Sequence, residues 1–236
     1  MQASRTDVLR TTAHKVRGRV ACVNVFDVLA RSTAPRPVAP RPGLAVVRET
    51  ALDGLLRDAP GERSGRLVTL VGRSALLSRA QLRSRRRRHR ARFARGDVAY
   101  VATLDGELAA WAWVALGPHV DCRWSGLHFE LDPGDAYLYD LWSFPVVRSS
   151  GAGAFVVEEM LRDLRERGLA DRAFGYVLRG NRASQVMHRL VLGFSQVQEV
   201  RGVRVMSHWA WQVPDSAVPP EGPCGPVPAR LPQVPA

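Results

Sequence analysis

The pattern of apolar and polar residues changes its period several times along the 236-residue chain. Apolar residues recur every three or four positions where we expect helices, and they alternate or form short runs where we expect strands. The predicted helices cover residues 50–58, 74–96, about 154–168 and 181–193, and residues 5–31, where the spacing is mixed, are assigned to one or two helices. The predicted strands cover residues 44–49, 135–144 and 173–180, and two pairs of strands cover 97–116 and 194–213.

Turn and cap residues separate these segments. Asp105-Gly106 is a strong signal for a two-residue hairpin turn, because both residue types tolerate positive φ. Arg201-Gly202 is assigned to the turn between the last two strands. Ser74 is a suitable N-cap for the long helix, and Gly96 can end that helix in the left-handed conformation. The predicted order is a strand, two helices, a hairpin, a strand, a loop with a helix, a strand, a helix and two strands.

Proline content divides the chain into a central domain and two flanking segments. Residues 32–43 contain four prolines and indicate an extended linker. We therefore assign residues 1–42 to an N-terminal helical extension with a Pro-rich linker, and residues 43–213 to one folded domain. Residues 214–236 are rich in Pro and Gly, and we expect this tail to be disordered.

The formal net charge is +12, and this charge favours anionic binding partners. Lys15 is the only lysine, so 33 of the 34 basic residues are arginine, which is typical of a GC-rich bacterial genome. Part of the basicity therefore reflects coding bias. A protein of this charge still attracts anions, so a phosphate-bearing cofactor, an acidic carrier protein and RNA are all candidate partners.

Several classes of protein are not indicated. No apolar run approaches the ~20 residues that a transmembrane helix needs, and the first residues lack the apolar block of a signal peptide. Cys22, Cys122 and Cys224 are too far apart for a disulfide framework or a metal-ligand motif. We expect a cytoplasmic protein without a metal and without a membrane partner.

The most informative short segment is a loop of small residues at 148–153, which lies between a predicted strand and a predicted helix. A helix N-terminus offers unpaired backbone N–H groups and a partial positive charge, and glycines let a phosphate approach them. Arg148 adds a full positive charge. The same residues would also suit a tight turn. The spacings of the P-loop and of the G-x-G-x-x-G dinucleotide motif are absent.

This loop resembles the acyl-CoA-binding signature of the GNAT N-acyltransferase superfamily, Q/R-x-x-G-x-G/A. The matching residues are Arg148, Ser149, Ser150, Gly151, Ala152 and Gly153, and Pro145 precedes them as it typically does in the family. Residues 177–194 resemble the second family signature through Asn181 and the closing Gly193-Phe194. The resemblance covers roughly residues 97–212, and residues 44–96 would supply the first strand and the acceptor-binding helices.

The resemblance implies an α/β (α+β) fold: a central, mixed, mostly antiparallel sheet of six to seven strands, with splayed parallel central strands and flanking helices. It implies transfer of an acyl group, most simply acetyl, from acyl-CoA to a primary amine by direct attack. The pantetheine arm would pair with the strand near residues 144–147. The implied CoA-binding residues are Phe144, Val146, Val147, Arg148, Ser149, Ser150, Gly151, Ala152, Gly153, Asn181 and Ser184.

Two residues are candidates for proton transfer. Asp140 is a carboxylate in an apolar, aromatic strand, five residues before Pro145, and burial there would raise its pKa toward that of a useful base. An exposed or ion-paired carboxylate is the alternative. Asn181, Ser184 and His188 are spaced to share one helix face, and His188 is the candidate acid for the departing thiolate. A histidine packed against the sheet is the alternative.

The spacing in the second signature differs from the usual family pattern. Gly193 follows Asn181 by twelve residues, where eleven is usual, and one additional residue turns an α-helix by about 100°. The correspondence with the family could therefore shift within this helix, and the position of His188 depends on where the shift falls.

The arginine run at 83–95 supports more than one interpretation. It can be a solvated helix face, or a cationic rim that favours an acidic acceptor, an acyl carrier protein or tRNA. The competing functions are therefore acyl transfer from acyl-CoA to a small amine or a peptide, transfer from a carrier protein or tRNA, and RNA binding on an inactive GNAT scaffold. A homodimer is a candidate assembly.

Overall fold

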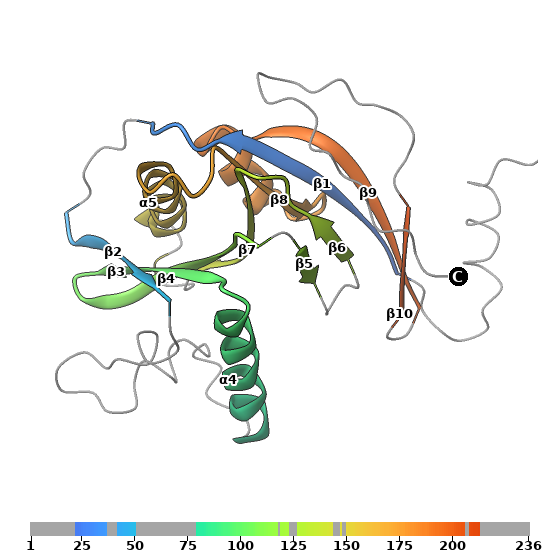
Figure 1. Cartoon of the computed structure of the whole chain (residues 1–236), viewed down its shortest axis with the longest axis horizontal. Coiled ribbons are helices and arrows are strands. Elements are labelled where there is room, and N and C mark those ends of the chain that lie inside the picture. Colours follow the sequence, from blue (N-terminus) through green and yellow to red (C-terminus); the bar gives the residue numbers. More distant parts are fainter. Residues whose placement is uncertain are drawn as a thin grey trace, which may run out of the picture.

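The computed structural model describes residues 22–36, 42–50, 79–117, 119–122, 127–143, 147, 150–205 and 208–212 (Figure 1). Residues 51–58 of the predicted helix 50–58, the start of the predicted helix 74–96, the chain before Cys22 and the predicted tail 214–236 lie outside these residues. Among the helices that are described, none combines the length and the hydropathy that crossing a bilayer requires.

An eight-stranded sheet in the order β10-β9-β1-β8-β7-β4-β3-β2 forms the centre of the described structure. Its strands are β1 (Cys22–Ser32), β2 (Leu44–Glu49), β3 (Val98–Leu104), β4 (Glu107–Ala115), β7 (Asp135–Ser143), β8 (Arg172–Leu178), β9 (Ser195–Val205) and β10 (His208–Gln212). All neighbours are antiparallel except β7 and β8. The predicted mixed, mostly antiparallel sheet is confirmed, with eight strands instead of six or seven.

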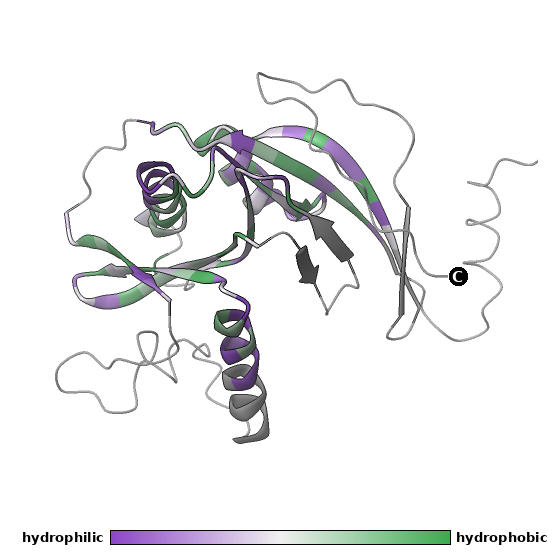
Figure 2. Ribbon diagram, viewed as in Figure 1, coloured by the Kyte–Doolittle hydropathy of each residue, from purple (hydrophilic) through white to green (hydrophobic). Residues whose placement is uncertain are grey.

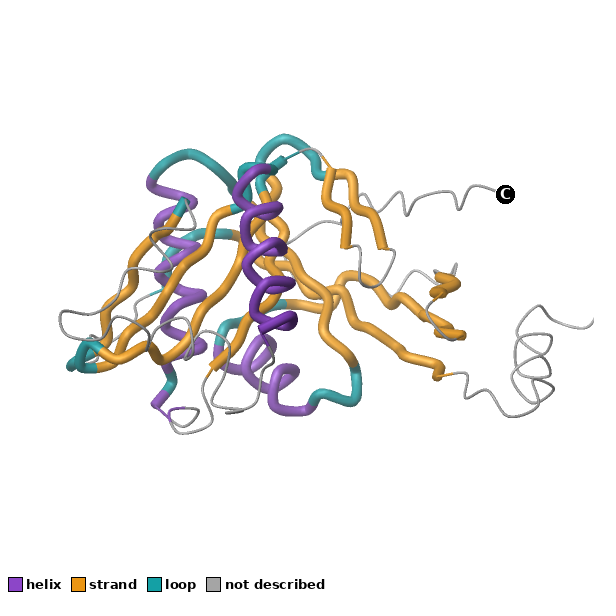
Figure 3. The backbone as a smooth tube through the Cα atoms, turned by 90° about the horizontal axis from the view of Figure 1, so that it is seen from below, coloured by secondary structure: helices purple, strands orange, loops and turns teal. Residues whose placement is uncertain are grey.

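Helices lie on both sides of this sheet, and a small hairpin lies beside it (Figure 1). The helices are α4 (Arg79–Ala94), α5 (Ala152–Glu166), the short α6 (Arg182–Val186) and the π-helical turn η2 (Met187–Val191). The hairpin consists of β5 (His119–Cys122) and β6 (Leu127–Glu130). In Figure 1, α5 lies on one side of β3 and β4 and α4 projects from the other side. Figure 3 shows α4 crossing in front of the strands.

The first described strand differs most from the prediction. Residues 22–31 were assigned to a helix, but Cys22–Ser32 is strand β1, which lies between β8 and β9. Six consecutive residues, 26–31, are buried, so both faces of β1 are covered. A strand that is buried on both faces loses its period-two alternation, and its sequence then cannot be distinguished from a buried helix. The sheet of the domain predicted to begin at residue 43 therefore includes an interior strand from the predicted N-terminal extension.

The turn and cap at Asp105-Gly106 and Gly96 were predicted correctly, and the turn at Arg201-Gly202 was not. The hairpin between β3 and β4 turns at Asp105-Gly106 with φ values of 51° and 82°, and Gly96 follows α4 with φ +86°, so both predictions are confirmed. The predicted turn at Arg201-Gly202 is wrong, because β9 continues to Val205 and Gly202 pairs with Asn24 of β1. Gly202 meets neighbouring strands on both sides, and cross-strand pairing outweighs the local turn preference there.

A buried ion pair connects β1 with the helices around the site. The guanidinium of Arg31 donates to both carboxylate oxygens of Glu158 in α5, at 2.6 and 3.2 Å, and both side chains are less than 10% exposed. Arg31 also donates to the carbonyl oxygens of Leu192, at 2.7 Å, and Ala34, at 3.2 Å. The three contacts to Glu158 and Leu192 hold α5 and the end of η2 against the middle of the sheet.

We expect Glu158→Gln to lower the free energy of unfolding by about 3 kcal/mol, at the lower end of the range for breaking a buried pair, because Gln keeps one acceptor for Arg31. Urea titration followed by circular dichroism measures this change. Glu159→Gln is the matched control, since the Glu159–Arg162 pair is partly exposed and should contribute less than about 1 kcal/mol. Equal unfolding midpoints for the two variants would contradict this expectation.

Candidate active site

A pocket opens where the two parallel strands separate. β7 and β8 pair only from Asp135 and Arg172 to Tyr137 and Phe174, a stretch of three residue pairs. One residue later the strands still touch, because a Cβ added to Gly175 would lie 2.9 Å from the carbonyl oxygen of Leu138. Beyond this point no ladder joins them, and a cavity of about 390 Å³ lies between their facing edges. The splayed parallel strands of the sequence analysis are therefore present.

A β-bulge in β7 contributes to this separation. Trp113 of β4 pairs with Tyr139 and Trp111 pairs with Trp142, so two residues of β7, Asp140 and Leu141, lie opposite a single residue of β4. Asp140 has φ +50°, a left-handed conformation that Asp adopts more readily than most residues. A bulge bends its strand and redirects side chains, and both bulged residues line the pocket.

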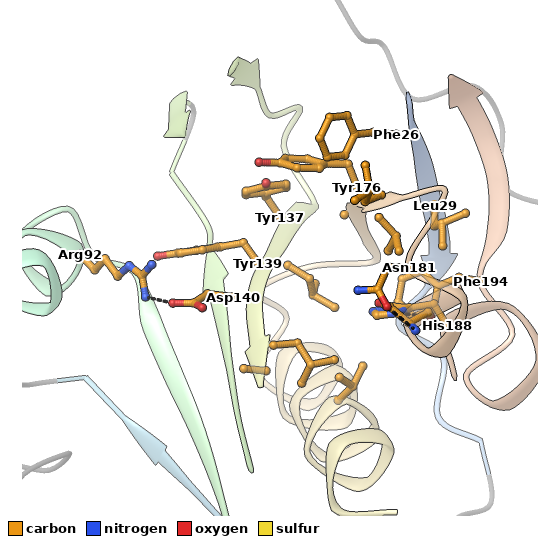
Figure 4. Close-up of a pocket in the computed structure, with 18 of the residues that line it drawn as sticks. Phe26, Leu29, Arg92, Tyr137, Tyr139, Asp140, Tyr176, Asn181, His188 and Phe194 are labelled. Atoms are coloured by element: carbon orange, nitrogen blue, oxygen red, sulfur yellow. Dashed lines mark hydrogen bonds and ion pairs between the residues drawn. The ribbon is translucent and has the colours of Figure 1, made fainter. Parts of the chain in front are cut away.

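Aromatic side chains form one wall of the pocket (Figure 4). The rings of Tyr137 and Tyr139 stack at 5.6 Å with an interplanar angle of 9°, and those of Tyr137 and Tyr176 stack at 6.0 Å. Phe26 of β1 contacts Tyr176 edge to face at 5.2 Å. The hydroxyl of Tyr139 donates to Asp97 at 2.5 Å, and burial raises the pKa of this phenol, so Tyr139 stays neutral. We refer to these four rings as the aromatic wall.

The last turns of α4 bring charge to the edge of the aromatic wall, beside Tyr139. Arg92 is only 8% exposed, and its Nη1 lies 2.5 Å from Oδ2 of Asp140. The same guanidinium lies over the rings of Trp113 and Tyr139, 4.8 Å from each centroid, a cation–π arrangement. Arg88, one helical turn earlier, also lines the pocket. In Figure 2 the described part of α4 carries strongly hydrophilic residues.

The surroundings of Asp140 differ from the prediction. Its side chain is 41% exposed and ion-paired with Arg92, whereas the sequence analysis expected burial to raise its pKa. The alternative of an ion-paired carboxylate describes the structure better. The cause is the bulge, which turns this residue out of the buried alternation of β7 and toward α4.

The third wall comes from the turn after β8 and from α6. Oδ1 of Asn181 caps α6 by accepting from the N–H of Ser184 at 3.3 Å. Nδ1 of His188 lies 2.8 Å from the carbonyl oxygen of Ser184 and 3.2 Å from its Oγ. All three residues line the pocket, as their spacing predicted.

The hydrogen bonds of His188 define its protonation. A carbonyl oxygen can only accept, so Nδ1 must carry the proton that it shares with Ser184. In the neutral ring Nε2 is then an acceptor. Burial lowers the pKa of His188 below 6.5, and the hydrogen bond to Ser184 opposes this only in part, so the neutral ring predominates at pH 7.

The extra residue in the second signature is accommodated by the π-helical turn. The N–H of Leu192 donates to the carbonyl of Met187, five residues earlier, at 2.9 Å, and Phe194 donates to His188 at 2.8 Å. A π turn takes up one more residue than an α turn, and such turns are frequent at functional sites. Phe194 consequently still reaches the pocket, where its ring meets that of His188 edge to face at 5.5 Å.

The glycine loop has the backbone geometry of an anion site. Gly151 has φ +79° and precedes α5 as its N-cap. The hydroxyl of Ser150 donates to the carbonyl of Val147 and accepts from the N–H of Ala152. The first backbone bond of the helix runs from Phe155 to Gly151, so the N–H groups of residues 153 and 154 have no acceptor within the helix.

Gly153 lies close to the end of β7. A Cβ at this position would lie 2.5 Å from Oγ of Ser143, so any other residue would force that hydroxyl to move. Phe144, Val146, Arg148 and Ser149, which the sequence analysis assigned to CoA binding, lie outside the described residues.

Several pocket residues were not identified from the sequence. Phe26 was assigned to a helix, Tyr176 was not singled out, Phe194 was noted only as the end of the second signature, and Arg88 and Arg92 were part of an undivided arginine run. The four-residue spacing of the two arginines was a usable signal, because residues four apart lie on one helix face.

Comparison with known proteins identifies the family. The profile of the acetyltransferase (GNAT) family matches residues 70–194, more than half of the chain. The protein therefore belongs to the GNAT acetyltransferase family, as the two signatures predicted. The matched range contains α4, the glycine loop, Asn181 and His188. A search of the curated proteins found no match.

Two of three similar solved structures, those with TM-scores above 0.5, share the fold at low sequence identity. A functionally unknown conserved protein from Staphylococcus epidermidis is 6% identical, with a TM-score of 0.53, and the alignment covers 88% of this chain and 69% of that one. A tandem GNAT protein from the clavulanic acid biosynthesis pathway is 17% identical, with a TM-score of 0.51 and coverages of 94% and 61%. A Drosophila protein is 13% identical, with a TM-score of 0.49 and coverages of 86% and 57%. The chain thus spans less than two thirds of the length of the last two proteins.

Proposed function

We propose that this protein transfers an acyl group, most simply acetyl, from a CoA thioester to a primary amine by direct attack. The observation that carries the proposal is the separation of β7 and β8, which opens a pocket through the sheet beside the start of α5. On one side the pocket is lined by residues 137–141 of β7, the strand that precedes the glycine loop and α5 in the chain. The other side is formed by the aromatic wall and α4, where an acceptor can approach.

The donor site follows from the unpaired backbone groups. Pyrophosphate oxygens suit the free N–H groups at the start of α5, with the loop residues 149–153 around them. The pantetheine arm contains two amides. Beyond Tyr137, the edge of β7 that faces β8 has no strand partner, so its backbone groups can form hydrogen bonds with these amides. Asn181 and Ser184 stand on the far side of the same gap.

Gly151→Val should weaken the binding of acetyl-CoA at least ~10-fold, about 1.4 kcal/mol, because it places a branched side chain at φ +79° where phosphate must approach. Isothermal titration calorimetry measures the affinity. Gly117→Ala is the control, since Gly117 has no positive φ and an added Cβ there meets nothing within 4 Å. A wild-type protein that binds no acetyl-CoA would overturn the proposed function.

We infer that His188 acts first as the base and then as the acid of the transfer. Neutral His188 can accept the proton that the amine loses as its nitrogen bonds to the acyl carbon. The imidazolium formed in this way can then protonate the sulfur as the carbon–sulfur bond breaks. This sequence needs no pre-formed imidazolium, which the lowered pKa of His188 disfavours at neutral pH. Asp140 and Arg92 border the acceptor side and would position the amine.

A further inference from the structure

The charges that line the pocket do not cancel. α4 contributes two guanidinium groups, Arg88 and Arg92, and β7 contributes one carboxylate, Asp140. Arg92 is buried and pairs with Asp140, so its charge is balanced. His188 is neutral at pH 7, and Tyr139 is held neutral by burial.

The unbalanced charge belongs to Arg88. Its side chain is exposed, and no ion pair joins it to any residue in the described part of the chain. It lies four residues before Arg92, on the same helix face, and therefore points to the same side of the pocket. A cation that lines a pocket and has no ion-pair partner among the described residues is suited to bind an anionic group of the ligand.

The shape of the pocket limits what carries that anion. Tyr139 and Tyr176 are half-buried rings that line the pocket, with the buried Tyr137 stacked between them, and the apolar ring surface that these two leave accessible is one against which an aromatic group packs favourably. The cavity of about 390 Å³ is near the small end of the range for ligand pockets, and the acyl end of the donor must share it. This space suits a small molecule.

Resting on the proposed function, we propose that the acceptor is a small aromatic amine that also carries a carboxylate or a similar anionic group. The ring lies on the aromatic wall, the anion pairs with Arg88, and the amine is directed toward His188. The arginine run of the sequence analysis thus acts at the acceptor pocket through one side chain, and a macromolecular partner is not needed to explain it.

Three probe molecules distinguish the contribution of the anionic group to binding from that of the aromatic ring. They are 4-(aminomethyl)benzoate, its neutral amide 4-(aminomethyl)benzamide, and the non-aromatic trans-4-(aminomethyl)cyclohexanecarboxylate. Calorimetry on the full chain saturated with CoA measures the dissociation constant of each in phosphate-free buffer. We expect the benzoate to bind about 10-fold more tightly than the amide, and also more tightly than the cyclohexane analogue.

The matched variants are Arg88→Gln and Arg87→Gln. Arg87 is an exposed neighbour on α4 that does not line the pocket, so its replacement removes the same charge from the general field. Arg88→Gln should reduce the preference for benzoate over benzamide to about 2-fold or less, whereas Arg87→Gln should leave it unchanged. Equal effects of the two variants, equal binding of benzoate and benzamide, or no binding of the benzoate would each overturn the inference.

The proposed function is tested separately in the same samples. CoA binding by wild type and by both variants is measured first, and its absence would contradict the proposed function and not the acceptor class. Retained CoA binding with no discrimination among the probes would leave the acyltransferase proposal intact and exclude this acceptor. Binding of bulk RNA that falls steeply with salt and is lost in both variants would assign the arginines to a nucleic acid instead.

Discussion

A chain that begins at residue 43 will not fold, although the sequence analysis placed the start of the domain there. Removing β1 exposes the facing edges of β8 and β9 and takes Phe26, Val28 and Leu29 from the core. Burial of three such side chains contributes about 5 to 9 kcal/mol, comparable to the whole stability of a typical domain of about 5 to 15 kcal/mol. Loss of Arg31 would also leave Glu158 buried without its partner.

Soluble yield, circular dichroism and thermal unfolding measure this outcome. The control is a chain that begins at residue 22, which keeps every described strand. We expect this control to unfold cooperatively and the shorter chain to aggregate or to lack a transition. A shorter chain that unfolds at the temperature of the control would show that β1 is dispensable and that the sheet closes without it.

His188→Phe should lower kcat by ~10²- to 10⁴-fold, the range typical of lost proton-transfer catalysis. Phe keeps the ring and its contact with Phe194, so CoA affinity should change little. His188→Gln is a second variant that keeps a polar group. Steady-state thiol release with an amine acceptor gives the rates. A His188→Phe enzyme at full speed would return this residue to a packing role.

The pH dependence separates the two roles that His188 could play. Burial lowers the pKa of His188 below 6.5, so a base is active at pH 7 and loses activity only as the pH falls below 6.5 through that lowered value. An acid that must start as imidazolium would instead lose activity as the pH rises through the same value. We expect the first profile.

The acceptor amine also ionises, and its contribution to the pH dependence is removed by taking the ratio of two kcat/KM profiles. Dividing the wild-type kcat/KM by that of His188→Phe at each pH cancels the titration of the acceptor. Asp140→Asn is the companion variant, because Asn tolerates the φ of +50° at this position. Loss of the acidic limb in Asp140→Asn, with its retention in His188→Phe, would assign the base to Asp140.

The sequence alone determined the local parts of the structure and the family. Gly151, Gly96 and the turn at Asp105-Gly106 all have positive φ, and this requirement acts within one or two residues of the chain. The Asn181-to-His188 spacing places both residues on one wall, because helix geometry is also local. Such features follow from residue type and spacing, so they could be predicted without any knowledge of distant neighbours.

Only the tertiary structure decided the position of β1, the surroundings of Asp140 and the role of Arg88. β1 is a strand because β8 and β9 cover its two edges and packed side chains cover its two faces. Asp140 is turned toward Arg92 by a bulge whose register depends on β4. Arg88 differs from Arg87 and Arg90 because α4 presents it to the pocket, and from Arg92 because Arg92 is paired with Asp140. In each case the deciding contacts join residues far apart in sequence, and local periodicity contains no information about them.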